Sequence, residues 1–262
     1  MPEKAIVAFI DILGYGNIVK DCKNEIEVAK SLESLIIGTL QMFKKVKDRS
    51  IDNTEAEFYR NKIIDNIKVK YISDTFLFTL QPITLHDDKL KYRDNVLMCM
   101  WLYFKFISML CPRIIGKTGL ILKGGISIDS HYENEFDGNF FIFSKAYNNA
   151  YNAQKKETAR IVIDDKLLSY LKETSYLDEY PEFFYENEDK KLCFDFYCLL
   201  KNDDKSKKVI SDIKKGVSTN IYKYNYDPDA MSKLMHFVKY HNKKINELKF
   251  NDLAIIFKKG TN

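Results

Sequence analysis

Two aspartates interrupt segments that otherwise look like buried β-strands, and they are the first residues able to do chemistry. Asp11 lies inside the apolar run AIVAFIDIL of residues 5–13, and Asp74 lies within KYISDTFLF of residues 70–78. A buried carboxylate is costly unless a partner or a metal compensates it. Each aspartate alone is also typical of a strand end that hydrogen-bonds to backbone. Together, on strands that we expect to lie side by side, they predict a paired oxygen site suited to Mg²⁺ or Mn²⁺.

A glycine turn follows Asp11 directly. Gly14, Tyr15 and Gly16 break the strand and precede an amphipathic helix, whose first backbone N–H groups would hold an anion such as a phosphate. Two glycines after a strand also occur in dinucleotide-binding folds, but Val19 stands where the third glycine of that motif belongs. The turn therefore favours phosphate binding beside Asp11.

The elements that must position these residues follow from hydrophobic periodicity. The predicted strands cover residues 5–13, two short segments of 67–80 that meet near Ser73 and Asp74, and residues 120–129, 140–143, 160–164 and 193–200. One helix is predicted after the glycine turn and a second over residues 93–111. Three more are predicted to begin near Ser144, to follow residue 164 and to cover 229–248. Strand, helix, two strands, helix and strand in this order predict an α+β, ferredoxin-like split βαβ fold with a central, mostly antiparallel sheet.

The chain length suits one main domain with an appendage. We expect a catalytic domain over residues 1–200, and a linker followed by a C-terminal helical extension over 201–262. Residues 201–218 are dominated by Lys, Asp and Ser and are interpreted as a charged linker. A hydrophobic content of 45% with 14% aromatic residues excludes a mainly disordered chain.

Charge and cysteine content indicate which partners and which cellular compartment to expect. The net charge of +4 comes from interspersed positive and negative residues, which argues against a nucleic-acid partner. The apolar run from Val96 to Leu110 holds about 15 residues, fewer than the roughly 20 needed to cross a bilayer, so no membrane partner is expected. Five cysteines without a CxxC pair and a start without a leader segment predict a cytoplasmic protein with reduced thiols. The four histidines are interpreted as surface or packing residues.

Three motifs resemble those of class III nucleotidyl cyclases. FIDILGYG (residues 9–16) resembles the first metal motif, KYISDTFLF (70–78) the second, and SKAYNNAY (144–151) the helix start that carries a transition-state asparagine. Their short, divergent versions look most like the pyrimidine cyclases of bacterial Pycsar anti-phage systems. The resemblance spans residues 4–165.

This resemblance implies a metal-dependent site. Asp11, Asp74 and the backbone carbonyl of Ile12 would bind two divalent cations, Mn²⁺ or Mg²⁺. These cations would activate the ribose 3′-hydroxyl and neutralise the triphosphate as pyrophosphate leaves. The Gly14–Tyr15–Gly16 turn and Lys123 would contact phosphates. Lys123 is equally typical of an exposed strand edge.

Two further residues are implied to meet the nucleotide. Lys70 lies four residues before Asp74, where the family keeps the side chain that reads the base. Its ammonium only donates hydrogen bonds, which disfavours GTP but leaves UTP, CTP and ATP open. Asn148 matches the transition-state asparagine. The family's arginine one helical turn later is replaced here by Asn152, and Lys155 is a candidate substitute.

The resemblance therefore implies a homodimer with active sites at its interface, the Asp pair coming from one protomer and Lys70 and Asn148 from the other. It would convert UTP or CTP to the 3′,5′-cyclic monophosphate and pyrophosphate, and the product would activate a separate effector in anti-phage defence. The alternatives are an adenylyl cyclase and a catalytically silent nucleotide-binding module. A diguanylate cyclase is disfavoured because the hairpin has no GGDEF-like sequence.

Overall fold

The computed structural model describes residues 3–15, 25–45, 64–81, 92–155, 159–223 and 227–256. Within these residues eight strands form one sheet: β1 (Glu3–Ile12), β2 (Ile67–Ile72), β3 (Thr75–Leu80), β4 (Leu122–Phe136), β5 (Asn139–Ser144), β6 (Ile161–Ile163), β7 (Phe184–Glu186) and β8 (Leu192–Phe194). The helices are α2 (Glu25–Lys45), α4 (Tyr92–Thr118), α5 (Lys145–Gln154), α6 (Asp165–Glu173), α7 (Tyr176–Glu179), α8 (Asp204–Lys223) and α9 (Pro228–Glu247), with short 3₁₀ turns η1 (Pro181–Phe183) and η2 (Asn251–Leu253).

The strand order confirms the predicted fold class. The sheet runs β2-β3-β1-β4-β6-β8-β7, with β5 pairing to β4. The first four strands in this order pair with one another antiparallel, and β1 lies between β3 and β4 although α2 and β2 separate it from β3 in sequence. This order is that of a ferredoxin-like split βαβ sheet, extended by β6 in parallel with β4.

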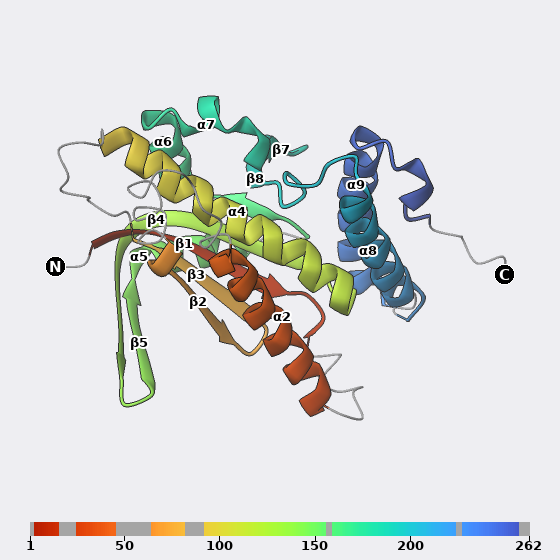
Figure 1. The fold of residues 1–262 in the computed structure, drawn as a ribbon, viewed down its shortest axis with the longest axis horizontal. Coiled ribbons are helices and arrows are strands. Elements are labelled where there is room, and N and C mark those ends of the chain that lie inside the picture. The colour runs from red at the N-terminus through yellow and green to blue at the C-terminus, as the bar shows by residue number, and fades with distance from the viewer. Residues whose placement is uncertain are drawn as a thin grey trace.

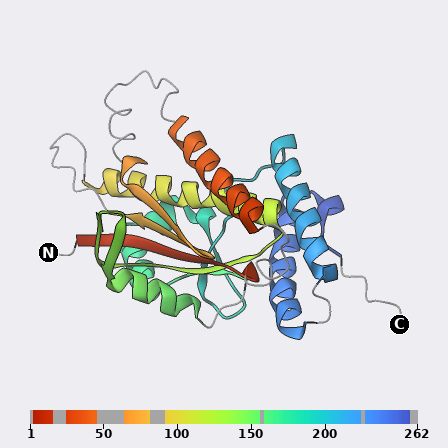
Figure 2. The ribbon, with the colours of Figure 1, turned by 90° about the horizontal axis from the view of Figure 1, so that it is seen from below.

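Each face of the sheet is covered differently. Helices α2 and α4 lie on one face and α5 lies on the other (Figures 1 and 2). The alternation of β1 follows this division: Ile6, Ala8, Ile10 and Ile12 join the large core on the α4 side, whereas Ala5 and Val7 pack with Leu77 and Ala146 of α5. The strand is therefore buried on both faces over residues 5–10, as its continuous apolar sequence predicts.

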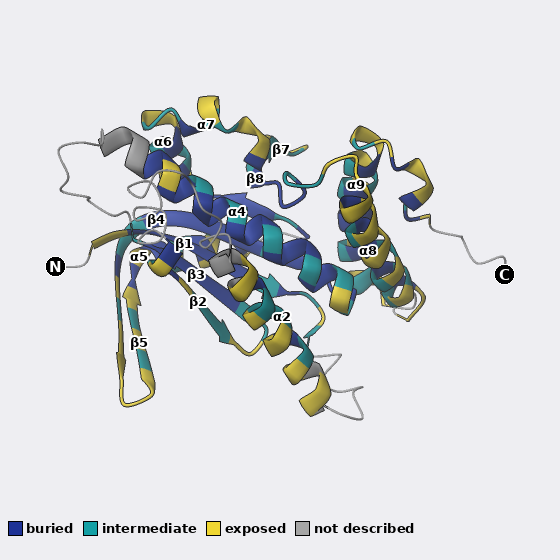
Figure 3. Cartoon of the chain, in the orientation of Figure 1, coloured by how far each residue is buried: buried dark blue, intermediate teal, exposed yellow. Residues whose placement is uncertain are grey.

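Helix α4 is longer than the sequence predicted. Pro112 lies inside it, and the helix continues to Thr118 because burial of Ile114 and Ile115 offsets the ~3 kcal/mol that an interior proline costs. The segment Val96–Thr118 is long and apolar enough to cross a membrane, so the expectation that this region is too short was wrong. In this fold 72% of its most apolar window is buried, and it forms the core helix of the sheet (Figure 3).

Three other boundaries also differ from expectation. Residues 204–223 form α8 rather than a linker, because Ile210, Ile213 and Val217 recur at helical spacing and are buried. Strand β4 continues to Phe136, and its end forms with β5 a hairpin that projects from the body (Figure 1). The strand expected over 193–200 ends at Phe194, since the Asp195 carboxylate accepts a hydrogen bond from the Tyr197 amide and closes a turn.

Candidate functional site

Strand register places the candidate residues on the α5 side of the sheet. Asp11 lies opposite Thr75 on one side and Lys123 on the other, because β1 is the strand between β3 and β4. It alternates with Ile10 and Ile12, which face the α4 core. Asp11 therefore lies on the face that α5 covers only in part, at the end of the sheet where β1 finishes.

The structure brings Asp74 to Asp11, as the sequence predicted. Asp74 lies in the turn between β2 and β3, where Ser73 adopts a left-handed conformation with φ of 57°. The amide of Ile12 donates a hydrogen bond to the Asp74 carbonyl at 2.8 Å, which ties the turn to β1. The pKa of Asp11 is raised, first by burial and then by repulsion from the Asp74 carboxylate. We call these two residues the carboxylate pair.

Lys123 is the basic residue that meets the carboxylate pair. Its Nζ atom lies 3.4 Å from Oδ2 of Asp11, and both side chains are about four-fifths buried, with 20% and 19% exposed. The attraction lowers the pKa of Asp11 but does not outweigh burial and Asp74. The lysine expected to contact phosphates thus lies beside the acids, where it supplies partial charge compensation.

The turn after β1 packs next to the same acids. Gly14 has φ of 84°, a conformation that favours glycine, and Tyr15 follows it. Burial raises the pKa of Tyr71, and so do the nearby Tyr15 and the charge of Asp74. The two tyrosines therefore lie close to Asp74. Gly16, the third residue expected in this turn, lies outside the described residues.

The carboxylate pair has the chemistry of a divalent-cation site. Across the described residues no group of three or more His, Cys, Asp or Glu side chains is placed to hold a metal ion. A buried carboxylate whose pKa is raised by a second carboxylate beside it is nevertheless a donor that a cation would stabilise, and Mg²⁺ or Mn²⁺ commonly completes its shell with carbonyl, water and phosphate oxygens. Asp11 and Asp74 therefore fit a metal that arrives with a phosphate substrate.

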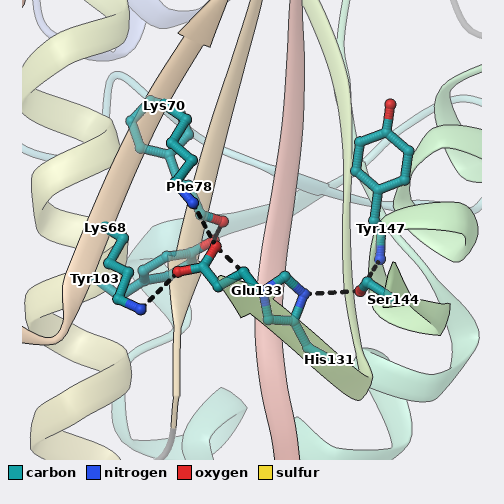
Figure 4. A network of polar contacts seen from close by, with 8 residues as sticks. All are labelled: Lys68, Lys70, Phe78, Tyr103, His131, Glu133, Ser144 and Tyr147. Carbon is teal, nitrogen blue, oxygen red and sulfur yellow. Dashed lines mark hydrogen bonds and ion pairs between the residues drawn. The ribbon is translucent and has the colours of Figure 1, made fainter. Parts of the chain in front are cut away.

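Lys70 lies away from the carboxylate pair, in a different charged cluster on the same face of the sheet. Its Nζ is 3.2 Å from Oε2 of Glu133 and 3.0 Å from the centre of the Phe140 ring. Lys68 approaches the other carboxylate oxygen at 2.7 Å. His131 and Ser144 continue the contacts (Figure 4). We call Lys68, Lys70, Glu133, His131 and Ser144 the Glu133 network.

Asn148 lies in the first half of α5, exposed to solvent. It lines a groove of about 550 Å³ together with Thr75 of β3 and Phe140 of β5. Helix α5 reaches this place because Gly125 has no side chain: a Cβ there would lie 2.1 Å from the carbonyl oxygen of Ala150. Asn152 lines a separate hollow of about 460 Å³ beside α6.

One chain therefore forms two partial sites. It brings Asp11, Asp74 and Lys123 together, and it brings Lys70 near the groove that Asn148 lines, but that groove does not include the carboxylate pair. Sequence reasoning missed Glu133 and Phe140, and treated His131 only as a surface or packing residue. The missed signal was alternation: residues 131 and 133 continue the face of β4 that carries Lys123 and Ser127.

Nucleotide cyclases are among the solved structures that are similar to this chain. No protein-family model and no curated protein matches the sequence. Among solved structures, the adenylyl cyclase CyaB from P. aeruginosa is similar with a TM-score of 0.36 and 14% identity, covering 74% of this chain and 92% of that one.

Two further cyclase structures show likenesses of the same order. A bacterial light-regulated adenylyl cyclase has a TM-score of 0.38 and 8% identity, covering 82% of this chain and 99% of that one. A dimeric guanylyl cyclase domain of the RhoGC fusion protein from the aquatic fungus Blastocladiella emersonii has a TM-score of 0.33 and 14% identity, covering 73% and 93%. The α+β fold itself follows from the strand order of this chain.

Proposed function

We propose that this protein is a nucleotidyl cyclase of the class III type, acting on UTP or CTP with Mg²⁺ or Mn²⁺. The observation that carries the proposal is the approach of Asp11, on β1, and Asp74, in the turn between β2 and β3, which are far apart in sequence. A protein that uses no metal gains nothing from two half-buried carboxylates whose charges repel. Retaining both at the end of a central sheet supports a catalytic reason for the pair.

Different residues of this chain would bind the cation and the phosphates in such a reaction. A divalent cation held by Asp11 and Asp74 would supply charge neutralisation for the triphosphate and for the attacking ribose oxygen. Lys123 Nζ lies 3.4 Å from Asp11, and when a substrate binds it would leave this carboxylate and pair with a phosphate oxygen instead. The backbone N–H groups of Gly14 and Tyr15, in the turn that follows β1, would orient the phosphates.

A homodimer completes the site in this proposal. Within one chain Asn148 lines the groove beside β5 and Lys70 lies next to it over Phe140, apart from the carboxylate pair. The hairpin of β4 and β5 exposes Phe136, Phe141 and Phe143, with 70%, 58% and 66% of their surface accessible. Exposed aromatic residues on one projecting hairpin are typical of an interface. Sedimentation should find a dimer, and Phe141→Ser with Phe143→Ser should weaken it.

The choice of a pyrimidine rests on Lys70 and on the motif resemblance. An ammonium can donate to cytosine N3, uracil O4 or adenine N1 but meets the N1–H of guanine poorly. The divergent motifs around Asp11, Asp74 and Asn148 resemble the pyrimidine cyclases of anti-phage systems. In that setting the product would activate a separate effector, and the enzyme would act in the cytoplasm.

A catalytically silent nucleotide-binding module is the second candidate. Two observations favour it: Asn152 lines a hollow separate from the Asn148 groove, and Lys123 already neutralises part of the charge on Asp11. In such a module the lysine would stand permanently in place of a cation. The difference between the candidates is turnover.

One assay tests the proposal. Purified protein is incubated separately with each of the four nucleoside triphosphates and Mn²⁺, and products are separated by chromatography, for the wild type, Asp11→Ala and Asp74→Ala. We expect one dominant cyclic pyrimidine product that either substitution abolishes, while the exposed control Asp178→Asn retains it. Cyclic AMP as the main product would instead identify an adenylyl cyclase. Nucleotide binding without any product, also with infected-cell extract added as activator, would favour the silent module.

A further inference from the structure

The Glu133 network joins three parts of the chain through buried polar contacts. Strand β2 supplies Lys68 and Lys70, the end of β4 supplies His131 and Glu133, and Ser144 ends β5 (Figure 4). The side chains of His131 and Glu133 are 0% and 2% exposed. Because β4 extends past β1 into the hairpin, it carries these two residues on the same face as Lys70.

Glu133 is the centre of the network. Burial by itself would raise the pKa of its carboxyl group, but the close contacts of His131 and Lys68 and the charge of Lys70 outweigh burial and lower that pKa to about 2. The carboxylate is therefore ionised at all ordinary pH values and only accepts hydrogen bonds. It holds Lys70 at 3.2 Å, against the face of Phe140.

His131 carries the contacts from Glu133 to α5. Its Nε2 atom lies 3.3 Å from Oε2 of Glu133, a close polar contact without hydrogen-bond alignment. Its Nδ1 atom shares a hydrogen bond of 2.8 Å with the Ser144 hydroxyl. The same hydroxyl oxygen accepts from the Tyr147 amide at 2.9 Å, which makes Ser144 the N-cap of α5. The chain of contacts therefore ends one residue before Asn148.

We propose that Glu133, His131 and Ser144 are positioning residues that hold Lys70 and the first turn of α5 in one fixed relation. The proposal rests on the cyclase function, in which Lys70 and Asn148 are the two groups that one protomer presents to the nucleotide. A continuous set of contacts from Lys70 Nζ to the Tyr147 amide places the base-reading lysine and Asn148 on a single rigid unit. Displacing either end then displaces the other, so binding of the base and alignment of the transition state are coupled.

If the network had a purely structural role, neither Lys70 nor Ser144 would need to lie at the groove that Asn148 lines. Phe140, which lies under the Lys70 ammonium, and Ser144, which caps α5, both line the 550 Å³ groove together with Asn148. The network therefore borders the space that a nucleotide would enter rather than the core beneath the sheet. Its members set the shape of that space.

Steady-state kinetics with all four triphosphates test the coupling. We compare Glu133→Gln, Ser144→Ala and Ser144→Thr with Glu173→Gln, an exposed glutamate on α6, as control. Since a hydrogen bond to a charged group contributes the equivalent of about tenfold in affinity, Glu133→Gln should raise KM for the preferred nucleotide about tenfold and reduce the preference among bases, and Ser144→Ala should change both in the same direction. Ser144→Thr, which keeps the hydroxyl, should restore both, and Glu173→Gln should change neither.

Amide hydrogen exchange tests the same coupling without turnover. In Lys70→Met the Tyr147 and Asn148 amides should exchange about tenfold faster than in the wild type, because the change at β2 loosens the α5 cap through Glu133 and His131. Unchanged exchange, or variants that lower the melting temperature while KM and base preference stay constant, would overturn the proposal. A wild type without product would contradict the cyclase function, and the exchange result would still decide whether the two ends are coupled.

Discussion

The carboxylate pair and the Glu133 network are two charged clusters on one face of one sheet, and their electrostatics are opposite. In the pair, burial and the neighbouring Asp74 raise the pKa of Asp11, and Lys123 compensates only in part. In the network, two lysines and a histidine surround one carboxylate and lower its pKa to about 2.

The carboxylate pair is therefore a site that can bind an added cation, whereas the Glu133 network already contains the positive charges that neutralise its carboxylate. The network satisfies its own carboxylate and therefore holds its members in place without a ligand. The pair keeps an excess of negative charge in a half-buried position, which a soluble fold tolerates when an added cation brings a function. A carboxylate thus serves as a cation ligand in the pair and as a fixed structural contact in the network.

The largest effect is expected from Asp11→Asn. Cyclase activity should fall about a thousandfold, because one of the two cation-binding carboxylates is lost. The free energy of unfolding at pH 7 should instead increase. Because the pKa of Asp11 is raised in the folded protein, its protonated form stabilises the fold fully below pH 3.8, and this stabilisation is lost as the pH rises through the folded-state pKa. Chemical denaturation should find the variant more stable at pH 7 and equal to the wild type near pH 3. Lower stability at pH 7 would mean that Lys123 fully compensates the acid.

Gly125→Ala should be the most destabilising single change near either cluster. The new Cβ would lie 2.1 Å from the Ala150 carbonyl oxygen and 3.1 Å from the Ala153 Cβ, so α5 must move off the sheet. Overpacking of this kind costs about 3 kcal/mol. Urea denaturation would measure the loss, with Gly138→Ala, at the open hairpin tip, as comparison. Because φ of Gly138 is 74°, that control should lose only about 1 kcal/mol. Equal losses would show that α5 does not depend on Gly125.

Glu133→Gln sharpens the electrostatic contrast through its pH dependence. The wild-type Glu133 stabilises the fold above the ordinary pKa of 4.5, and this contribution disappears as the pH falls from 4.5 towards 2. The variant should be about 2 kcal/mol less stable at pH 7, below the loss for a fully buried pair because Lys68 and Lys70 stay partly exposed. It should equal the wild type at pH 2. A constant difference between pH 7 and pH 2 would show that packing, and not charge, holds the network.

The smallest effect concerns the turn that presents Asp74. Ser73 has φ of 57°, a conformation that costs a non-glycine residue about 1 kcal/mol, so Ser73→Gly should stabilise the fold by about 0.5 kcal/mol after the entropy of glycine is included. Thermal denaturation would measure this shift. Activity should remain within twofold, since Asp74 keeps its backbone contact to Ile12. A large loss of activity would indicate that Ser73 takes part in the site itself.

Much of the fold could be predicted because its signals are local. The apolar run of β1, the hairpin around Asp74 and the cap at Ser144 each depend on neighbouring residues, and the structure has them where expected. The split βαβ order then made β1 the strand beside β3. The approach of Asp11 to Asp74 followed from that order.

The Glu133 network could not be predicted in the same way. Its contacts depend on how far β4 extends beyond β1, and on the pairing of Glu133 with lysines from a strand that is not its neighbour in the sheet. Helix α8 was missed for a different reason: Ile210, Ile213 and Val217 recur at helical spacing in the sequence, but the Lys, Asp and Ser residues between them led to the linker interpretation.

The sequence by itself determined most of the strands and helices of residues 1–165, and it identified the two aspartates as unusual, because hydrophobic periodicity and the cost of a buried charge are properties of a few neighbouring residues. Only the tertiary structure decided which charges meet. Whether a carboxylate lies beside another acid or between two lysines depends on strand register and on where a hairpin bends, and these are set by packing over the whole sheet.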